Sequence, residues 1–489
     1  PLVKIDEVGK SYDYKPLDVY RMAVGLEMPL ESCERFMMEL AIDGFVRYSL
    51  DKKEVEVLPK TTEYILNNSN RRDYDVIRFL SNVEKGMNAR ISLLDFDMEV
   101  FGVSTIALSD SQRVALYPES NGVLIHKNLN FDFDGRIEAG RFTFYSRKNK
   151  FDYSLFRFNM PVIDSMNFSV PSFQQMEDGS RPLVRVRNTI ENISGELLID
   201  YPSNKSSYQR YPEYPIFKSE KSAKIFYDVP YDGVYERDKF YVNIDPFQID
   251  SLDNTTTEGL VFKGEFKSSD IFQTRRQDIR VQDDYSFGFT QETGDLGWST
   301  FGGKGLVKGA VKLSIAGLRL NGSVSFKEAV GSSSRFELFP DTLIGNGDFK
   351  LNPMEGLPRG AGHPGVSGDF VHMKWEPKLN TWWSTSLDQP FNTYSDRSMD
   401  VYGSLTYTPG FLDANGLLAF DNAELEGKVI RLFSKWIQSG RADFRVRESE
   451  ISEWSFQMNN SISEVDFVTN KGVFELQDGD NTLMFPRNK

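Results

Sequence analysis

Apolar and polar residues alternate along much of the chain after about residue 86. Phe131 and Phe133 alternate with Asp132 and Asp134. Successive residues of a strand point to opposite faces, so this alternation is typical of a strand with one buried face. The pattern predicts a mainly β chain built from many short strands. Further runs of this kind contain Phe142 and Phe144, and Phe156, Phe158 and Met160.

Many of these runs contain a glycine that precedes the alternating apolar residues. The spacing between the copies is irregular, so no fixed repeat period is assigned. Glycine permits a turn or a bulge, and we expect it at strand starts. The recurrence predicts an elongated β-solenoid or an open groove-like sheet. Examples are Gly140-Phe142-Phe144, Gly322-Val324-Phe326, Gly403-Leu405-Tyr407 and Gly440-Ala442-Phe444.

The first 85 residues follow a different pattern. Cys33, Phe36, Met37 and Leu40 fall at i, i+3, i+4 and i+7, which predicts a helix over 31–42.

A hairpin is predicted over 45–58, with further helices over 61–66 and 73–83. We therefore expect residues 1–85 to form a small α/β cap or a winged-helix-like segment.

Composition shifts divide the rest of the chain. Residues 86–200 and 259–489 form two predicted β-repeat regions, and we expect the second to continue beyond residue 489. Residues 201–258 are rich in tyrosine and proline, and proline disfavours central strands. This segment is predicted to be an excursion or a domain junction. A Gly- and Pro-rich loop is predicted over 353–369.

Charge and composition limit the classes of partner. Aromatic residues make up 13% of the chain, which suits half-buried strands. The net charge of −14 argues against a nucleic-acid partner, because phosphate binding needs a cationic surface. Residues 1–60 also carry more acidic than basic residues, which argues against DNA binding by a winged helix.

The chain has a single cysteine, Cys33, so no disulfide within it is possible. No apolar run reaches the ~18 residues of a transmembrane helix, so no transmembrane segment is predicted. Because the chain begins with Pro1 and ends directly after a strand-like run, we expect it to be processed or part of a longer protein.

Motifs for catalysis are scarce. His126 lies in an apolar run, which favours a strand residue over a catalyst. His363 and His372 have no recognisable zinc spacing. The segment 302–305 (GGKG) lacks the pattern of a phosphate-binding loop and precedes a predicted strand. No cofactor or metal ion is predicted.

Two carboxylate pairs could perform acid/base chemistry on sugars: Asp132 with Asp134, and Asp283 with Asp284. With 71 acidic residues in the chain, such pairs arise by chance, and the pattern favours solvated strand faces over a catalytic pair.

Aromatic and aliphatic residues of the second β region are the candidate ligand-binding residues. Trp375, Trp382 and Trp383 could stack on sugar rings, and one of the two adjacent tryptophans should face away from the core. Val324 and Phe326 are predicted to face inward, where they would line an apolar groove that holds acyl chains. The alternative is that such residues close on one another as an ordinary core.

From about residue 259 to 489, the chain resembles the repetitive β segments of large bacterial envelope proteins. The stretches 416–427 (GLLAFDNAELEG) and 464–472 (EVDFVTNKG) carry the resemblance. It is to the AsmA/TamB-like and LptA-like proteins, which form periplasmic lipid-conducting grooves. It implies a place in the bacterial periplasm or cell envelope, near the outer membrane, with lipid or envelope proteins as partners. The helical and Tyr/Pro-rich segments depart from this pattern.

Three functions follow as hypotheses. The first is a non-enzymatic envelope scaffold that conducts lipid through an apolar β groove. The second is a carbohydrate-binding or carbohydrate-cleaving β-helix surface protein. The third is a structural adhesin or partner-binding module. An open apolar trough would favour lipid conduction. A polar cleft with two carboxylates beside a tryptophan would favour carbohydrate binding or cleavage. A closed core would favour the structural adhesin or partner-binding module.

Overall fold

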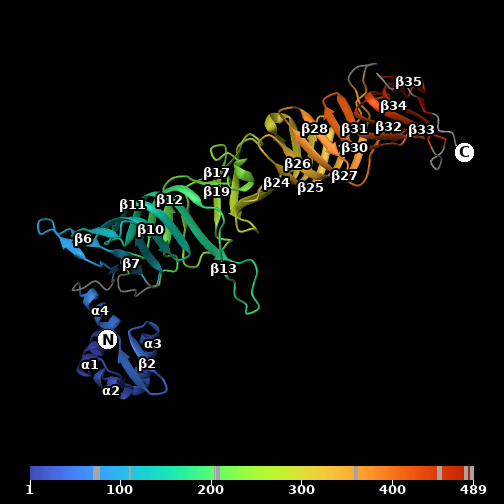
Figure 1. The fold of residues 1–489 in the computed structure, drawn as a ribbon. Coiled ribbons are helices and arrows are strands. Elements are labelled where there is room, and N and C mark those ends of the chain that lie inside the picture. Colours follow the sequence, from blue (N-terminus) through green and yellow to red (C-terminus); the bar gives the residue numbers. More distant parts are fainter. Residues whose placement is uncertain are drawn as a thin grey trace. The chain divides into compact units, whose positions relative to one another are not determined.

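The computed structural model confirms a mainly β protein with a small helical N-terminal segment (Figure 1). It describes residues 1–69, 77–109, 112–202, 204, 210–356, 362–448, 454–477 and 483–484. The chain forms two compact units. The first comprises Pro1–Arg185, Thr189–Ala223 and Asp245–Leu260, and the second comprises Val186–Asn188, Lys224–Ile244 and Val261–Lys489.

The first unit begins with the helical segment. Its elements are α1 (Leu2–Ser11), β1 (Leu17–Asp18), α2 (Val19–Gly25), α3 (Leu30–Ile42), β2 (Val46–Ser49), β3 (Glu54–Val57) and α4 (Pro59–Asn68). The three strands form an antiparallel sheet in the order β1-β3-β2.

The predicted helix over 31–42, the hairpin and the helix over 61–66 are confirmed by α3, by β2–β3 and by α4. Cys33, Met37 and Leu40 of α3 are buried together with Ile5 and Val55. Burial raises the pKa of the Cys33 thiol, and the neighbouring Glu34 carboxylate raises it further.

The predicted helix over 73–83 is wrong where the structure describes it, because β4 (Arg78–Ser81) is a strand. Residues 73–76 lie outside the described residues. Arg78 pairs with Ala107 of β7, so pairing with a distant strand decides the conformation of this short segment.

The remaining strands of the first unit pair antiparallel. Phe131, Phe133, Phe151 and Phe158 contact one another at centroid distances of 4.7–6.2 Å and are buried. The strands are β4, β5 (Ala89–Ile91), β6 (Met98–Phe101), β7 (Val103–Ser109), β8 (Val114–Pro118), β9 (Gly122–Ile125), β10 (Phe131–Ala139), β11 (Phe142–Asp152), β12 (Arg157–Pro171), β13 (Leu183–Arg185), β14 (Ile190–Leu198), β15 (Ile216–Ser219) and β18 (Gln248–Ile249).

The second unit continues the antiparallel pattern, mostly between strands that follow each other in sequence. One of the boundaries between the units falls inside β16 (Ala223–Phe226). The later strands are β17 (Phe240–Ile244), β19 (Val261–Ser268), β20 (Arg275–Val281), β21 (Phe287–Glu292), β22 (Trp298–Thr300), β23 (Gly305–Ser314), β24 (Gly317–Phe326), β25 (Ala329–Leu338), β26 (Leu343–Leu351), β27 (Val366–Glu376), β28 (Thr381–Thr385), β29 (Phe391–Thr393), β30 (Met399–Thr408), β31 (Phe411–Phe420), β32 (Ala423–Leu432), β33 (Trp436–Arg447), β34 (Trp454–Asp466), β35 (Lys471–Leu476) and β36 (Leu483–Met484).

Two predicted irregular segments contain more structure than expected. Residues 201–258 include β15 to β18, and Tyr227 and Tyr235 are buried with their hydroxyls donating to Phe287 O and Leu338 O at 3.1 and 2.8 Å. Tyr208 lies outside the described residues. The predicted loop over 353–369 ends early, because β27 begins at Val366, and its residues 357–361 are not described.

Gly322, Gly403 and Gly440 lie in the middle of strands, so the expectation that they begin strands is wrong for these three. Gly140 lies in the turn directly before β11, as expected. In β24, Gly322 occupies the inner face between the buried Leu320 and Val324. Gly403 of β30 lies directly opposite Gly416 of β31.

Close contact between neighbouring backbones explains this position. A Cβ atom on Gly416 would lie 2.1 Å from the carbonyl oxygen of Tyr402, and Gly416 has a φ of +134°. Both features exclude a side chain, so the glycine lets paired strands approach at the centre of the buried face.

Gly416→Ala should therefore lower the free energy of unfolding by about 2–3 kcal/mol, because the new Cβ atom forces the paired strands apart. Gly440→Ala is the matched control, since its Cβ would lie 3.8 Å from the nearest atom. We expect the control to stay within about 0.5 kcal/mol of the parent protein in urea unfolding. Equal losses in the two variants would contradict the close-approach explanation.

Candidate functional site

The five candidate ligand-binding residues all lie in the second unit. Val324, Phe326, Trp375 and Trp382 are buried, with exposed fractions of 0, 2, 0 and 0%. Trp375 of β27 pairs directly with Trp382 of β28, and their rings stack at a centroid distance of 6.0 Å. These four residues therefore belong to the closed inner face.

Trp383 lies on the opposite face of β28 and is half-buried. Lys374 places its ammonium 5.4 Å from the centroid of the Trp383 ring. The prediction that the two adjacent tryptophans face opposite sides is confirmed. Sugar stacking needs an exposed ring face, which Trp375 and Trp382 do not have.

Aromatic contacts extend this inner face in both directions. Phe326 lies 5.1 Å from Trp375 and 6.1 Å from Tyr407, measured between ring centroids. Phe349 lies 5.9 Å from Trp382. These rings pack against one another on the inner face.

A polar cluster that the sequence did not reveal borders these rings. The hydroxyl of Tyr407 donates a hydrogen bond to the carboxylate of Glu328. The buried ring of His363 lies edge-on to Tyr407, with its centroid 5.4 Å away. The three residues are distant in the sequence and meet only through strand pairing, so no local motif could have predicted them.

His363 is held as a neutral side chain within this cluster. Burial lowers its pKa, and this outweighs the raising effects of the carbonyl of Pro364 and the carboxylate of Glu328. Nδ1 lies 3.1 Å from Pro364 O, and Nε2 has no hydrogen-bond partner among the described residues. A buried, neutral histidine of this kind is typical of a core residue.

The carboxylate pair Asp132 and Asp134 borders a cleft of about 570 Å³ in the first unit. Lys148 and Lys150 of β11 lie on the same cleft, and the backbone N–H of Lys148 donates to Asp134 Oδ1 at 2.5 Å. The cleft therefore combines three carboxylates, those of Glu99, Asp132 and Asp134, with two ammonium groups. Its other lining residues are Val100, Phe101, Ser120, Gly122, Val123, Leu124 and Phe133.

His126 lies just after β9 and bridges two carboxylates near this cleft. Its Nδ1 is 3.0 Å from Asp97 Oδ2, and its Nε2 is 3.9 Å from Asp132 Oδ2. A catalytic relay of this kind also needs a nucleophile. Ser120 carries the one hydroxyl among the residues that line the cleft, and it donates to Gly122 O. The histidine serves here as a hydrogen-bond partner of Asp97.

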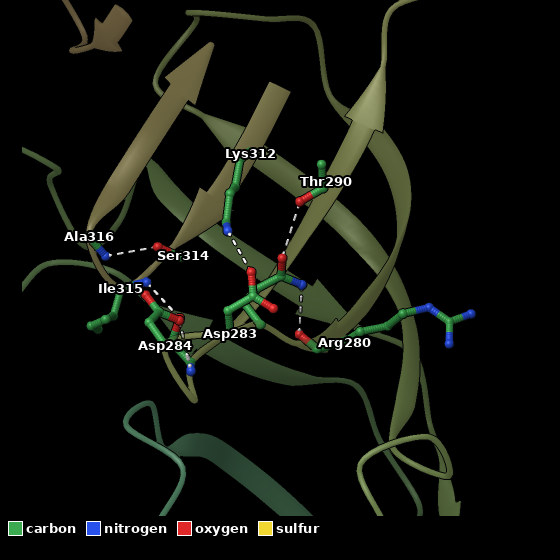
Figure 2. Close-up of polar contacts among 10 residues, drawn as sticks. Arg280, Asp283, Asp284, Thr290, Lys312, Ser314, Ile315 and Ala316 are labelled. Carbon is green, nitrogen blue, oxygen red and sulfur yellow. Dashed lines mark hydrogen bonds and ion pairs between the residues drawn. The ribbon is translucent and has the colours of Figure 1, made fainter. Parts of the chain in front are cut away.

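The second carboxylate pair, Asp283 and Asp284, has two separate roles (Figure 2). Asp283 is 95% exposed and lies 3.4 Å from the ammonium of Lys312. Asp284 points the other way and accepts hydrogen bonds from the backbone and the hydroxyl of Ser286, at 3.1 and 2.6 Å. The two groups do not face a common point where a substrate could bind.

Asp284 links two turns of the second unit. The hydroxyl of Ser286, held by Asp284, accepts a hydrogen bond from the backbone N–H of Ile315 at 2.9 Å. Burial would raise the pKa of Asp284, but hydrogen bonds from Ser286 and Ser314 outweigh it and lower the pKa. The carboxylate is therefore a structural acceptor that stays ionised.

The glycine-rich segment 302–305 also has a structural role. It forms the end of a short 3₁₀ turn, η2 (Phe301–Gly303), and the start of β23. Lys304 donates to the carbonyl of Pro377 at 2.6 Å and to Asn380 at 3.0 Å. As expected, a strand follows this segment instead of the helix that a phosphate-binding loop requires.

Within the described ranges, no group of three or more His, Cys, Asp or Glu residues is arranged to hold a metal ion. In the same part of the chain, no helix has the length and apolarity needed to span a membrane. Comparison with protein-family models, curated proteins and solved structures gave no match to this chain.

Asp284→Asn should lower the free energy of unfolding by about 1 kcal/mol, because an ionised acceptor is lost. The lowered pKa of Asp284 means that its contribution is present above the ordinary carboxyl pKa of about 4 and is lost as pH falls through the folded-state pKa.

In urea unfolding at a series of pH values, the parent protein should lose this contribution in acid and Asp284→Asn should not. Asp283→Asn is the control and should leave stability within about 0.5 kcal/mol, since Asp283 is exposed. A larger loss in Asp283→Asn than in Asp284→Asn would overturn the assignment.

Proposed function

We propose that this chain is a non-enzymatic β scaffold whose closed inner face supports binding surfaces on its outside. The stack of Trp375 on Trp382, with both residues fully buried, is the observation that supports this most strongly. In a closed core, the inner residues serve stability, and partners meet loops and outer faces.

The carboxylates support a non-enzymatic role. Asp284 is engaged by Ser286 and Ser314, Asp283 by Lys312, and Asp134 by the backbone of Lys148. An acid/base pair for sugar cleavage needs two carboxylates on opposite sides of one substrate-binding position. Asp283 and Asp284 diverge, which disfavours that geometry for this pair.

Lipid conduction remains the sharpest alternative, and the resemblance to envelope proteins motivates it. A conducted acyl chain would have to separate Phe326 from Trp375 and Tyr407, because these rings occupy the inner face. The scaffold proposal keeps the envelope location suggested by that resemblance and leaves the inner face closed.

Val324→Asp distinguishes the two alternatives, since Val324 is fully buried. In a closed core, an unpaired buried charge should lower the free energy of unfolding by more than about 3 kcal/mol. In a lipid groove, the variant would stay folded and only lose lipid. Thermal unfolding followed by circular dichroism measures the first effect, with the exposed Asn321→Asp on the same strand as the control.

Native mass spectrometry of the gently purified full chain, followed by lipid extraction, measures the second effect. We expect the spectrum to show the mass of the chain without any bound lipid. A stoichiometric phospholipid that a folded Val324→Asp variant no longer carries would overturn the closed-scaffold proposal in favour of conduction.

A further inference from the structure

The loop between β5 and β6 exposes an unusual concentration of apolar side chains. Leu93 and Leu94 are 80% and 93% exposed, and Phe96 is 48% exposed. Ile91, at the end of β5, is 52% exposed. These four residues are called the apolar tip below.

The backbone of the apolar tip is held in a defined turn. The N–H of Ser92 donates to Asp97 O at 2.9 Å, and the N–H of Phe96 donates to Ser92 O at 3.0 Å. Asp95 Oδ1 accepts from the N–H of Asp97 at 3.3 Å. The turn thus keeps the two leucines directed into solvent, although folding gains nothing from their exposure.

The tip is convex and stands at the end of a narrow support. Figure 1 shows the β5–β6 hairpin in light blue beside the β6 label, projecting from the sheet of the first unit. Only three residue pairs join its two strands, from Ala89 with Val100 to Ile91 with Met98. A fluid lipid layer can accept a convex apolar end without a preformed cavity, whereas a protein partner needs a matching one.

The charged groups around the tip do not form a cationic patch. Arg90 pairs with Glu99, and Asp97 lies 3.0 Å from His126 Nδ1. Lys127 places its ammonium 5.2 Å from the centroid of the Phe96 ring. A tip of this kind is not attracted to anionic lipid, and the net charge of −14 opposes such attraction further.

Asp95 limits the depth to which the apolar tip can enter a lipid layer. Hydrogen bonds from the side chain of Ser92 and the backbone of Asp97 lower its pKa, so it is ionised at neutral pH. An ionised carboxylate stays hydrated. The leucines can therefore enter only the boundary between headgroups and acyl chains, where water still reaches Asp95.

We propose that the apolar tip is a lipid-binding element that inserts Leu93 and Leu94 into the interfacial layer of an uncharged, zwitterionic lipid surface. This proposal is independent of the closed inner face, because the tip lies outside it. The affinity should be weak and reversible, no stronger than the association constant of about 10⁴ M⁻¹ typical of a single myristoyl chain.

The test is co-sedimentation of the full chain with dioleoylphosphatidylcholine vesicles. We expect measurable binding that 0.5 M salt leaves unchanged and that falls at least about tenfold in the double variant Leu93→Asp/Leu94→Asp, as charges are introduced where insertion needs apolar groups. Ile42→Asp is the control, because it also places an aspartate at a highly exposed apolar position, in α3 instead of the tip. It should leave binding unchanged.

A second readout locates the contact. The only native cysteine, Cys33, is buried, so Leu94→Cys offers a selective position for the environment-sensitive fluorophore NBD. Its emission should shift to the blue on addition of the vesicles. The proposal is overturned by no binding of the parent protein, by equal binding of the double variant, by an unshifted emission, or by binding only to vesicles that contain anionic phosphatidylglycerol.

Discussion

Packing of aromatic rings from neighbouring strands is the interaction on which the second unit depends. Phe326, Trp375, Trp382 and Tyr407 come from four strands and contact one another through their rings. Large buried rings tolerate little variation in the distance between strands. The backbones must therefore approach closely where no ring lies between them. Mid-strand glycines such as Gly416 permit that approach. Ring packing and the placement of glycines thus both follow from the required separation of the strands.

Local patterns predicted the features that local physics decides. The alternation around Phe131 and Phe133 predicted strands, and the spacing of Cys33 and Met37 predicted α3, because side-chain direction follows from backbone period alone. The opposite orientation of Trp382 and Trp383 has the same origin. The position of Gly322 within its strand was mistaken, because a glycine followed by alternating apolar residues gives the same pattern at a strand start and in a strand centre.

Features that depend on register or on turn geometry could not be predicted. The contact of His363 with Tyr407 and Glu328 requires the pairing of several strands. Asp283 and Asp284 are adjacent in sequence, which suggested a shared site, yet the turn that holds them directs one toward Lys312 and the other toward Ser286 (Figure 2). Proximity along the chain gives the distance between two carboxylates but not the direction of either.

Because the inner residues are buried against one another, a partner can contact only loops and outer faces. Burial does not explain the apolar residues that lie exposed on those surfaces. Inside the sheets, burial accounts for the apolar residues, and hydrogen bonds account for the carboxylates. At Leu93 and Leu94 neither explanation applies, since a hydrogen-bonded turn holds both side chains in water. A polar residue at either position would satisfy the same turn and remove the unfavourable hydration of an apolar group. The fold itself therefore does not explain the two exposed leucines.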